Sequence, residues 1–363
     1  MLKQNLSLAP AAGASPNADF APSKQSPVLL NNISLLRLLF AYSVALSHAA
    51  VLLGGDDLLL LRKILNSEAA VQGFFILSGG LVVASYERLR NPAIFYRRRL
   101  SRIFPAYALA VLIFAACSIG DAVLSGRMIS LGQIAGYLAA NLTTLNFLQP
   151  EIDGVFAANP YATINGALWS IKVELMFYAT VPLLVLLMHK IGIKWMLFLM
   201  LVTGGLWWPI LQLAFGIYDR EPPLSLYFQV PGQVHFFALG IGMFAHAQGR
   251  LSAVEFGAMI ALVLGLLAIL GNVTQVERVL ALMAFILVVT RLPQLPFSGI
   301  KNDFSYGIYL AHFPIIQLLI ANGATELPLI AYFAALSILA FAYGWFSWNV
   351  IERPAMRHWG KQS

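Results

Sequence analysis

An arginine and a histidine share one face of the first apolar stretch of the sequence. Arg37 and His48 lie eleven residues apart within residues 31–53, which contain no other basic or acidic residue. If this stretch is an α-helix, eleven residues make about three turns, so both side chains point the same way, about 16 Å apart along the axis. A cavity along this face would join the two leaflets of a membrane. Alternatively, Arg37 extends to the nearer membrane surface and His48 hydrogen-bonds to a neighbouring helix.

A second row of polar side chains lies on residues 166–188, another apolar stretch. Ser170, Glu174 and Tyr178 are spaced by four residues, so they share a helix face. If this helix runs from outside to inside, Glu174 lies at the depth of His48. A carboxylate beside an imidazole fixes its tautomer and raises its basicity, as in acid–base catalytic pairs. We therefore predict a contact between Glu174 and His48. The alternative is an ion pair with Lys172, but residues two apart on a helix point away from each other.

Another histidine lies near the middle of the apolar stretch 304–321. Tyr309 and His312 are three residues apart, so they share a helix face. His312 is therefore a candidate site residue. The alternative is a hydrogen bond that joins two helices at a bend made by Pro314.

A cluster of arginines lies at one membrane surface, between the second and third apolar stretches. Arg97, Arg98, Arg99 and Arg102 fall within six residues. Guanidinium groups bind phosphates with paired hydrogen bonds, so an anionic ligand is one interpretation of the cluster. The alternative is a topology anchor that contacts anionic lipid head groups. Near the end of the sequence, Glu352 is expected to pair with arginines at the same surface.

The elements that must position these residues are transmembrane helices. Of the 363 residues, 59% are hydrophobic and 11% are charged, whereas soluble proteins carry about 25% charged residues. The mean hydropathy is +0.76. The net charge of +7 lies in short clusters between apolar stretches, which favours a topology signal over nucleic-acid binding. The single cysteine, Cys117, excludes a disulfide within the chain and a cysteine metal site, and we predict no metal.

We predict an all-α, polytopic bundle of about ten transmembrane helices. The expected spans are residues 31–53, 68–86, 103–120, 166–188, 194–217, 230–248, 252–271, 274–291, 304–321 and 328–349. Most basic residues between spans fall on one side if both termini are cytoplasmic, with exceptions at Arg62, Lys63, Arg127 and Arg220.

This orientation divides the chain into one membrane domain and two short tails. Residues 1–27 are polar and are expected to form a disordered cytoplasmic tail. Residues 28–357 form the membrane domain, and residues 358–363 a second cytoplasmic tail. Residues 121–165 are expected to be an extracytoplasmic loop. Its apolar part, 131–148, would lie on or re-enter the membrane, since a further span would invert everything after it.

Six motifs, in order, resemble acyltransferase family 3, the membrane O-acyltransferases that modify bacterial surface glycans. They cover residues 31 to 357 and comprise Arg37 with His48; Gly73-Phe74-Phe75-Ile76-Leu77-Ser78-Gly79; the arginine cluster ending in Arg102-Ile103-Phe104-Pro105; Leu168-Trp169-Ser170 with Glu174, Phe177 and Tyr178; Phe304-Ser305-Tyr306-Gly307-Ile308-Tyr309-Leu310 with His312 and Pro314; and Ile351-Glu352-Arg353-Pro354.

The resemblance implies an acyl-coenzyme A donor, most often acetyl-CoA, and it assigns roles to the residues above. The phosphates would bind Arg98, Arg99 and Arg102, and the pantetheine arm would pass Arg37. His48 would act as general base or carry the acyl group briefly. The expected catalytic set is His48, Glu174, Arg37 and His312, and the groups that could polarise the carbonyl are Ser170, Tyr178 and Tyr309.

The resemblance also implies the partners and the location. The sequence shows no soluble esterase-like domain, so we expect the short, single-module type that acetylates O-antigen, exopolysaccharide or Nod-factor sugars. The expected partners are acyl-CoA, a glycan or lipid-linked saccharide and the lipid bilayer, without nucleic acid, and the expected location is a bacterial inner membrane. The alternative function is a transporter or flippase of lipid-linked glycans, although we find no repeated halves.

Overall fold

The described part of the protein is entirely helical. The computed structural model describes residues 32–295 and 303–360, and no strand occurs within them. Apolar runs of this length form helices because a helix satisfies its own backbone hydrogen bonds, which lipid cannot do. The all-α prediction is therefore confirmed. The expected tail at residues 1–27 lies outside the described residues, as do residues 361–363 of the second expected tail.

Each of the ten expected spans contains a helix. Their bounds are α1 Ile33–Leu53, α3 Ser67–Leu89, α4 Pro92–Leu124, α6 Trp169–Ile191, α7 Ile193–Gly216, α9 Val230–Ala247, α10 Ala253–Ile269, α11 Val273–Arg291, α12 Ser305–Ala321 and α13 Leu329–Phe346. Short helices not foreseen from the sequence are η2 Asp56–Leu58, α2 Leu59–Ile64, α8 Leu224–Tyr227, η3 Ala324–Glu326, the π-helical turn η4 Ser347–Glu352 and α14 Arg353–Gly360.

The protein is a multi-pass membrane protein. Among the described residues, 7 helical segments are long and apolar enough to cross a membrane, and α10 and α12 are shorter apolar helices. Ten spans and two cytoplasmic termini stay predictions.

The third expected span, at 103–120, is only the later part of a longer helix. Helix α4 starts at Pro92, where the Asn91 side chain accepts a hydrogen bond from the Ile94 backbone N–H, 3.1 Å away. An Asn cap followed by proline is a strong helix start. Its 33 residues span about 50 Å, more than the roughly 30 Å of a hydrocarbon core. The arginine cluster therefore lies on the first turns of α4 rather than in a loop.

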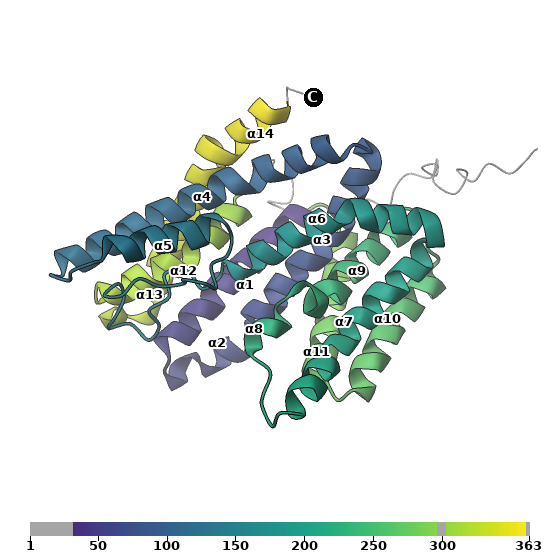
Figure 1. The fold of residues 1–363 in the computed structure, drawn as a ribbon, viewed down its shortest axis with the longest axis horizontal. Coiled ribbons are helices and arrows are strands. Elements are labelled where there is room, and N and C mark those ends of the chain that lie inside the picture. The colour runs from purple at the N-terminus through teal and green to yellow at the C-terminus, as the bar shows by residue number, and fades with distance from the viewer. Residues whose placement is uncertain (1–31, 296–302, 361–363) are drawn as a thin grey trace, which may run out of the picture.

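Helix α3 lies at the centre of the bundle and packs against α1, α6 and α9 (Figure 1). Its contact with α9 depends on glycine at two positions. A Cβ atom on Gly240 of α9 would meet the backbone carbonyl of Ile76, and one on Gly79 of α3 would meet that of Phe237. Small residues allow two helix backbones to approach closely in a membrane, where packing rather than the hydrophobic effect holds helices together. Helix α1 packs on its other side against α12, which also packs against α13.

The segment 121–165 begins with the last turn of α4 and then contains one further helix, α5 Leu131–Leu142, with 12 residues. It is about 18 Å long, too short to cross a bilayer of about 30 Å in one pass. It packs along α4 (Figure 1), where the Tyr107 hydroxyl donates to the backbone carbonyl of Asn141 at 2.6 Å. The Asn141 side chain in turn donates to the carbonyls of Tyr137 and Gln149, which fixes the loop that follows.

Candidate active site

Two histidines from helices far apart in the sequence are in direct contact. Nδ1 of His48 on α1 lies 2.9 Å from Nε2 of His312 on α12. Their rings are nearly parallel, at 10° and 5.2 Å between centroids. His312 is fully buried, whereas His48 is partly exposed. The other nitrogen of His312, Nδ1, lies 2.7 Å from the backbone carbonyl oxygen of Tyr309.

This chain of contacts assigns the protons of both rings in their neutral forms. A carbonyl oxygen only accepts, so Nδ1 of His312 carries a proton and its Nε2 accepts. Nδ1 of His48 must then donate, which leaves a lone pair on Nε2 of His48. No described residue hydrogen-bonds to this Nε2. The site thus holds an imidazole whose tautomer is set by a neighbour and whose basic nitrogen has no hydrogen-bond partner among the described residues.

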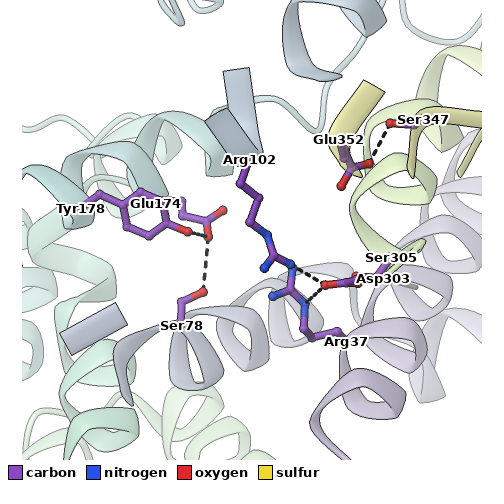
Figure 2. Close-up of polar contacts among 9 residues, drawn as sticks. All are labelled: Arg37, Ser78, Arg102, Glu174, Tyr178, Asp303, Ser305, Ser347 and Glu352. Carbon is purple, nitrogen blue, oxygen red and sulfur yellow. Dashed lines mark hydrogen bonds and ion pairs between the residues drawn. The ribbon is translucent and has the colours of Figure 1, made fainter. Parts of the chain in front are cut away.

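The predicted contact between Glu174 and His48 is wrong. Glu174 Oε1 accepts hydrogen bonds from the hydroxyls of Tyr178 at 2.5 Å and Ser78 at 3.4 Å (Figure 2). His312 takes the expected place of Glu174 beside His48, because α1 packs against α12 while α6 packs against α3. The alternative pairing with Lys172 does not form either, since the Lys172 amino group donates to Gln229 Oε1 at 3.1 Å.

Ser170 and Tyr309 were predicted to polarise a carbonyl group, and their hydroxyl groups are hydrogen-bonded to each other. The Ser170 Oγ and Tyr309 Oη atoms lie 2.6 Å apart. Each also reaches the backbone carbonyl of Ala167, at 3.3 Å from Ser170 and 3.0 Å from Tyr309. Tyr309 therefore joins two features, because its hydroxyl contacts Ser170 and its backbone carbonyl holds His312.

A pocket of about 430 Å³ lies among α1, α3, α6 and α12. This volume includes space that is open to solvent, so it does not describe an enclosed cavity. Its polar wall includes Arg37, Glu174, Ser170 and Tyr309, and the other lining residues are Val71, Phe74, Phe75, Ser78, Ile171, Ser305 and Tyr306. The histidine pair is not part of the wall but adjoins it through Tyr309. The four-residue spacing of Ser170 and Glu174 thus places both in one pocket.

A cluster of charges around Asp303 reaches one end of the pocket through Arg37 and Ser305. Asp303 Oδ2 lies 3.2 Å from Arg37 Nε and 2.5 Å from Arg102 Nη2 (Figure 2). The Ser305 hydroxyl donates to the other oxygen, Oδ1. Burial raises the pKa of Asp303, but the charges of Arg37 and Arg102 and the hydrogen bond from Ser305 outweigh it and hold the pKa at about 2.

Asp303 is the residue that sequence reasoning missed. Its position in the sequence could have identified it, because an acidic residue just before the apolar stretch 304–321 lies at the same end of the bundle as Arg37 and Arg102. A buried arginine at that level requires a counter-ion. Because the arginines were expected to bind the phosphates of the donor, no acidic partner within the chain was predicted for them.

The three arginines predicted to bind phosphate have different surroundings. Arg102 pairs with Asp303. The Arg99 guanidinium lies over the rings of Phe95 and Tyr178, 5.8 and 5.7 Å from their centroids. Arg98 is exposed on α4. The structure therefore brings Arg102 to Arg37 and Arg99 to Tyr178.

The expected pairing of Glu352 with an arginine is also wrong. Glu352 is fully buried, and its Oε1 accepts from the Ser347 hydroxyl at 2.8 Å (Figure 2). Within the described ranges it has no ion pair shorter than 4.0 Å, and its Oε2 has no hydrogen-bond partner. The cause is the π-helical turn at Ser347–Glu352, which turns the carboxylate inward; such turns are frequent at functional sites.

Comparisons with known proteins agree with the resemblance drawn from the motifs. The profile of a family described as an acyltransferase domain matches residues 30–349. Nodulation protein 10 of Rhizobium leguminosarum bv. viciae is 29% identical over 352 residues, which cover 90% of this chain and 93% of that protein. The O-acetyl transferase of Shigella phage Sf6 is 24% identical over 341 residues, 89% of this chain and 95% of that protein. No solved structure matches the chain significantly.

The family match extends over all but the ends of the chain and includes both histidines, the pocket and the Asp303 cluster. The chain therefore belongs to this family of membrane acyltransferases.

Proposed function

We propose that the protein transfers an acyl group, in the first instance acetyl, from acyl-coenzyme A to a hydroxyl group of a glycan. The observation that carries the proposal is the hydrogen-bonded series from the carbonyl of Tyr309, which lines the pocket, through His312 to His48, where Nε2 keeps its lone pair. An imidazole with a fixed tautomer and a free lone pair near a pocket suits general-base assistance of O-acyl transfer. The family membership and the name of the phage relative support the same reaction class.

In the proposed reaction, Nε2 of His48 removes the proton of the acceptor hydroxyl. The hydroxyl oxygen attacks the thioester carbonyl, so that a C–O bond forms and the C–S bond breaks. The thiolate of coenzyme A leaves and takes the proton back from His48. Alternatively, His48 attacks first and carries the acyl group to the hydroxyl. A burst of coenzyme A release without acceptor distinguishes the second route. General-base assistance of this kind contributes about 10²–10⁴-fold in rate.

The pocket residues serve the donor in this proposal. Ser170 and Tyr309 share a hydrogen bond at the wall of the pocket, and either hydroxyl would turn to the carbonyl oxygen as negative charge develops there. Glu174 does not orient His48. As a carboxylate in the wall of the pocket, it would accept hydrogen bonds from the amide N–H groups of the pantetheine arm. The Tyr178 hydroxyl, bonded to Glu174, holds that carboxylate in place.

The charged end of the pocket would meet the phosphate end of the donor. Arg37 lines the pocket, with Arg102 beside it on Asp303 and Arg98 and Arg99 on the same helix as Arg102. Guanidinium groups suit phosphate geometry. In this arrangement the donor lies along α1, with its phosphates towards Arg37 and its thioester towards His48, about 16 Å away at the α-helical rise.

The acceptor is proposed to be an exopolysaccharide, an O-antigen or a lipid-linked saccharide at a bacterial inner membrane. The support is the resemblance of the motifs to glycan O-acyltransferases, together with the O-acetyl transferase among the relatives. A glycan hydroxyl is a weak nucleophile, so it needs the base that His48 supplies.

Membranes that contain the protein test this proposal when they are given acetyl-CoA labelled in the acetyl group. We expect label in glycan, in an ester bond that mild alkali breaks. Membranes without the protein are the control. If the glycan crosses the membrane and gains no label, the transporter alternative replaces the acyltransferase proposal.

A further inference from the structure

Asp303 is shared by two arginines from two different helices. Arg37 lies on α1 and Arg102 on α4, and both reach the same oxygen of Asp303, which directly precedes α12 (Figure 2). The Ser305 hydroxyl occupies the other oxygen. The carboxylate therefore has three partners and links three helices at the charged end of the pocket.

The two arginines use Asp303 differently. Arg102 donates a hydrogen bond to it. Arg37 Nε lies at ion-pair distance, 3.2 Å, but is not aligned as a hydrogen-bond donor. Arg37 also lines the pocket, which Arg102 does not. Arg102 is thus the fixed counter-charge of Asp303, whereas Arg37 is held by attraction with its guanidinium at the pocket wall.

Removal of the carboxylate would leave two guanidinium groups close together without a shared anion. Like charges in a partly buried site repel, and the repulsion is weakly screened there. The side chain of Arg102 is 26% exposed, and the side chain of Arg37 is 20% exposed. Arg37, which has no aligned hydrogen bond to hold it, is the one free to move away from the pocket.

We infer that Asp303 is a positioning residue, which holds Arg37 at the end of the pocket where the phosphate groups of the donor bind. The inference rests on the proposed acyl-CoA donor. Asp303 acts through Arg37 and does not touch the reacting atoms. A guanidinium fixed in advance binds a phosphate ester better than a mobile one, because less side-chain freedom is lost on binding.

The rival interpretation is that Asp303 occupies the place of the phosphate and must be displaced by it. The geometry favours a holding role. A carboxylate with hydrogen bonds to both oxygens and two cationic partners is costly to uncouple, because two partly buried arginines would lose their counter-ion. The two interpretations predict opposite effects on donor affinity when Asp303 is neutralised.

The test compares two donors in full-length protein purified in detergent. Acetyl-CoA carries the phosphates, and acetyl-pantetheine lacks them but has the same thioester and arm. The variants are Asp303→Asn, which removes the charge, and Asp303→Glu, which keeps it. Glu255→Gln is the matched control, because Glu255 forms an exposed ion pair with Lys194 at the start of α10, away from the pocket.

For Asp303→Asn we expect KM for acetyl-CoA to rise about tenfold or more, with kcat little changed, because a charge-assisted phosphate contact is lost. KM for acetyl-pantetheine should stay within about twofold of wild type. Asp303→Glu should restore part of the acetyl-CoA affinity, and Glu255→Gln should match wild type with both donors, because an exposed ion pair contributes little.

Three results overturn the inference. Equal losses with both donors mean that Asp303 serves the fold alone. A lower KM for acetyl-CoA in Asp303→Asn means that the carboxylate competes with the phosphate. Transfer from neither donor by the wild type refutes the proposed donor and the inference together, and it is recognised because the wild type itself is inactive.

Discussion

Nδ1 of His48 lies 2.9 Å from Nε2 of His312, although 264 residues separate them in the chain. The contact exists because α1 and α12 pack side by side. It gives His48 a fixed tautomer with a free lone pair on Nε2, and it gives His312 a supporting role that differs from that of an independent acid or base. The predictions below follow from this pair and from the charges and close packing around it.

His312 should be replaceable in part by a side chain that accepts a hydrogen bond. His312→Ala should lower kcat for acetyl transfer about 10- to 100-fold, because His48 loses the acceptor that fixes its tautomer. His312→Gln should recover part of this loss, since its amide oxygen can accept from Nδ1 of His48. Steady-state kinetics with acetyl-CoA measure both. Equal activities for the Ala and Gln variants would refute the tautomer argument.

Glu174 should affect the donor more than the chemical step. Because it contacts Ser78 and Tyr178 in the pocket wall and not His48, Glu174→Gln should raise KM for acetyl-CoA about three- to tenfold, as for one lost charged hydrogen bond. The pH dependence of kcat should stay as in the wild type, and Tyr178→Phe should have a smaller effect on KM. A shifted pH profile in Glu174→Gln would restore the direct pairing that the structure argues against.

The Asp303 cluster should make stability depend on pH in acid. The pKa of Asp303 is about 2 in the folded protein, against about 3.9 when unfolded. The unfolded state therefore binds more protons between these values, so the contribution of Asp303 is fully present above about pH 4 and is lost as pH falls through 2; it amounts to roughly 2 kcal/mol.

Thermal unfolding in detergent between pH 2 and 7 measures this dependence. Asp303→Asn should be less stable than the wild type at pH 7 and should lose less on acidification, because the titrating group is gone. Parallel curves for the two proteins would contradict the assignment of a low pKa to Asp303.

The contact of α3 with α9 should not tolerate a side chain at Gly240. Gly240→Ala places a Cβ against the Ile76 carbonyl and should destabilise the protein by about 1–3 kcal/mol through overpacking. Gly257→Ala is the matched control, since Gly257 also lies in a helix but has no atom within 4 Å of an added Cβ. That variant should be neutral or stabilised by up to about 1 kcal/mol. Unfolding midpoints in detergent distinguish the two variants. A Gly240→Ala variant as stable as the wild type would refute the close approach of α3 and α9.

Helix positions and helix faces were predictable from the sequence, but helix neighbours were not. Apolar stretches located the ten long helices, and the four-residue spacing put Ser170 and Glu174 on one pocket wall. The predicted depth of a residue in the membrane does not determine which helix packs beside it. For that reason Glu174 was assigned to His48, whereas α12 lies there and supplies His312.

The charged end of the pocket shows the same limit for single residues. Arg102 was expected to bind a ligand because its type suits phosphate, yet it pairs with Asp303. Glu352 was expected at the surface near arginines, but the π-helical turn buries it. An added residue in a helical turn changes the direction of a side chain without any sign in hydropathy.

The central claim is that His48 is the base, or the acyl carrier, of an acetyl transfer. Its most direct test is transfer of labelled acetyl from acetyl-CoA to glycan by the wild type, His48→Ala and His358→Ala at matched amounts in membranes. His358 is an exposed histidine on α14 and controls for loss of an imidazole elsewhere. The account predicts label with the wild type and His358→Ala, and a loss of at least about 100-fold with His48→Ala. Transfer by His48→Ala at the wild-type rate would contradict it.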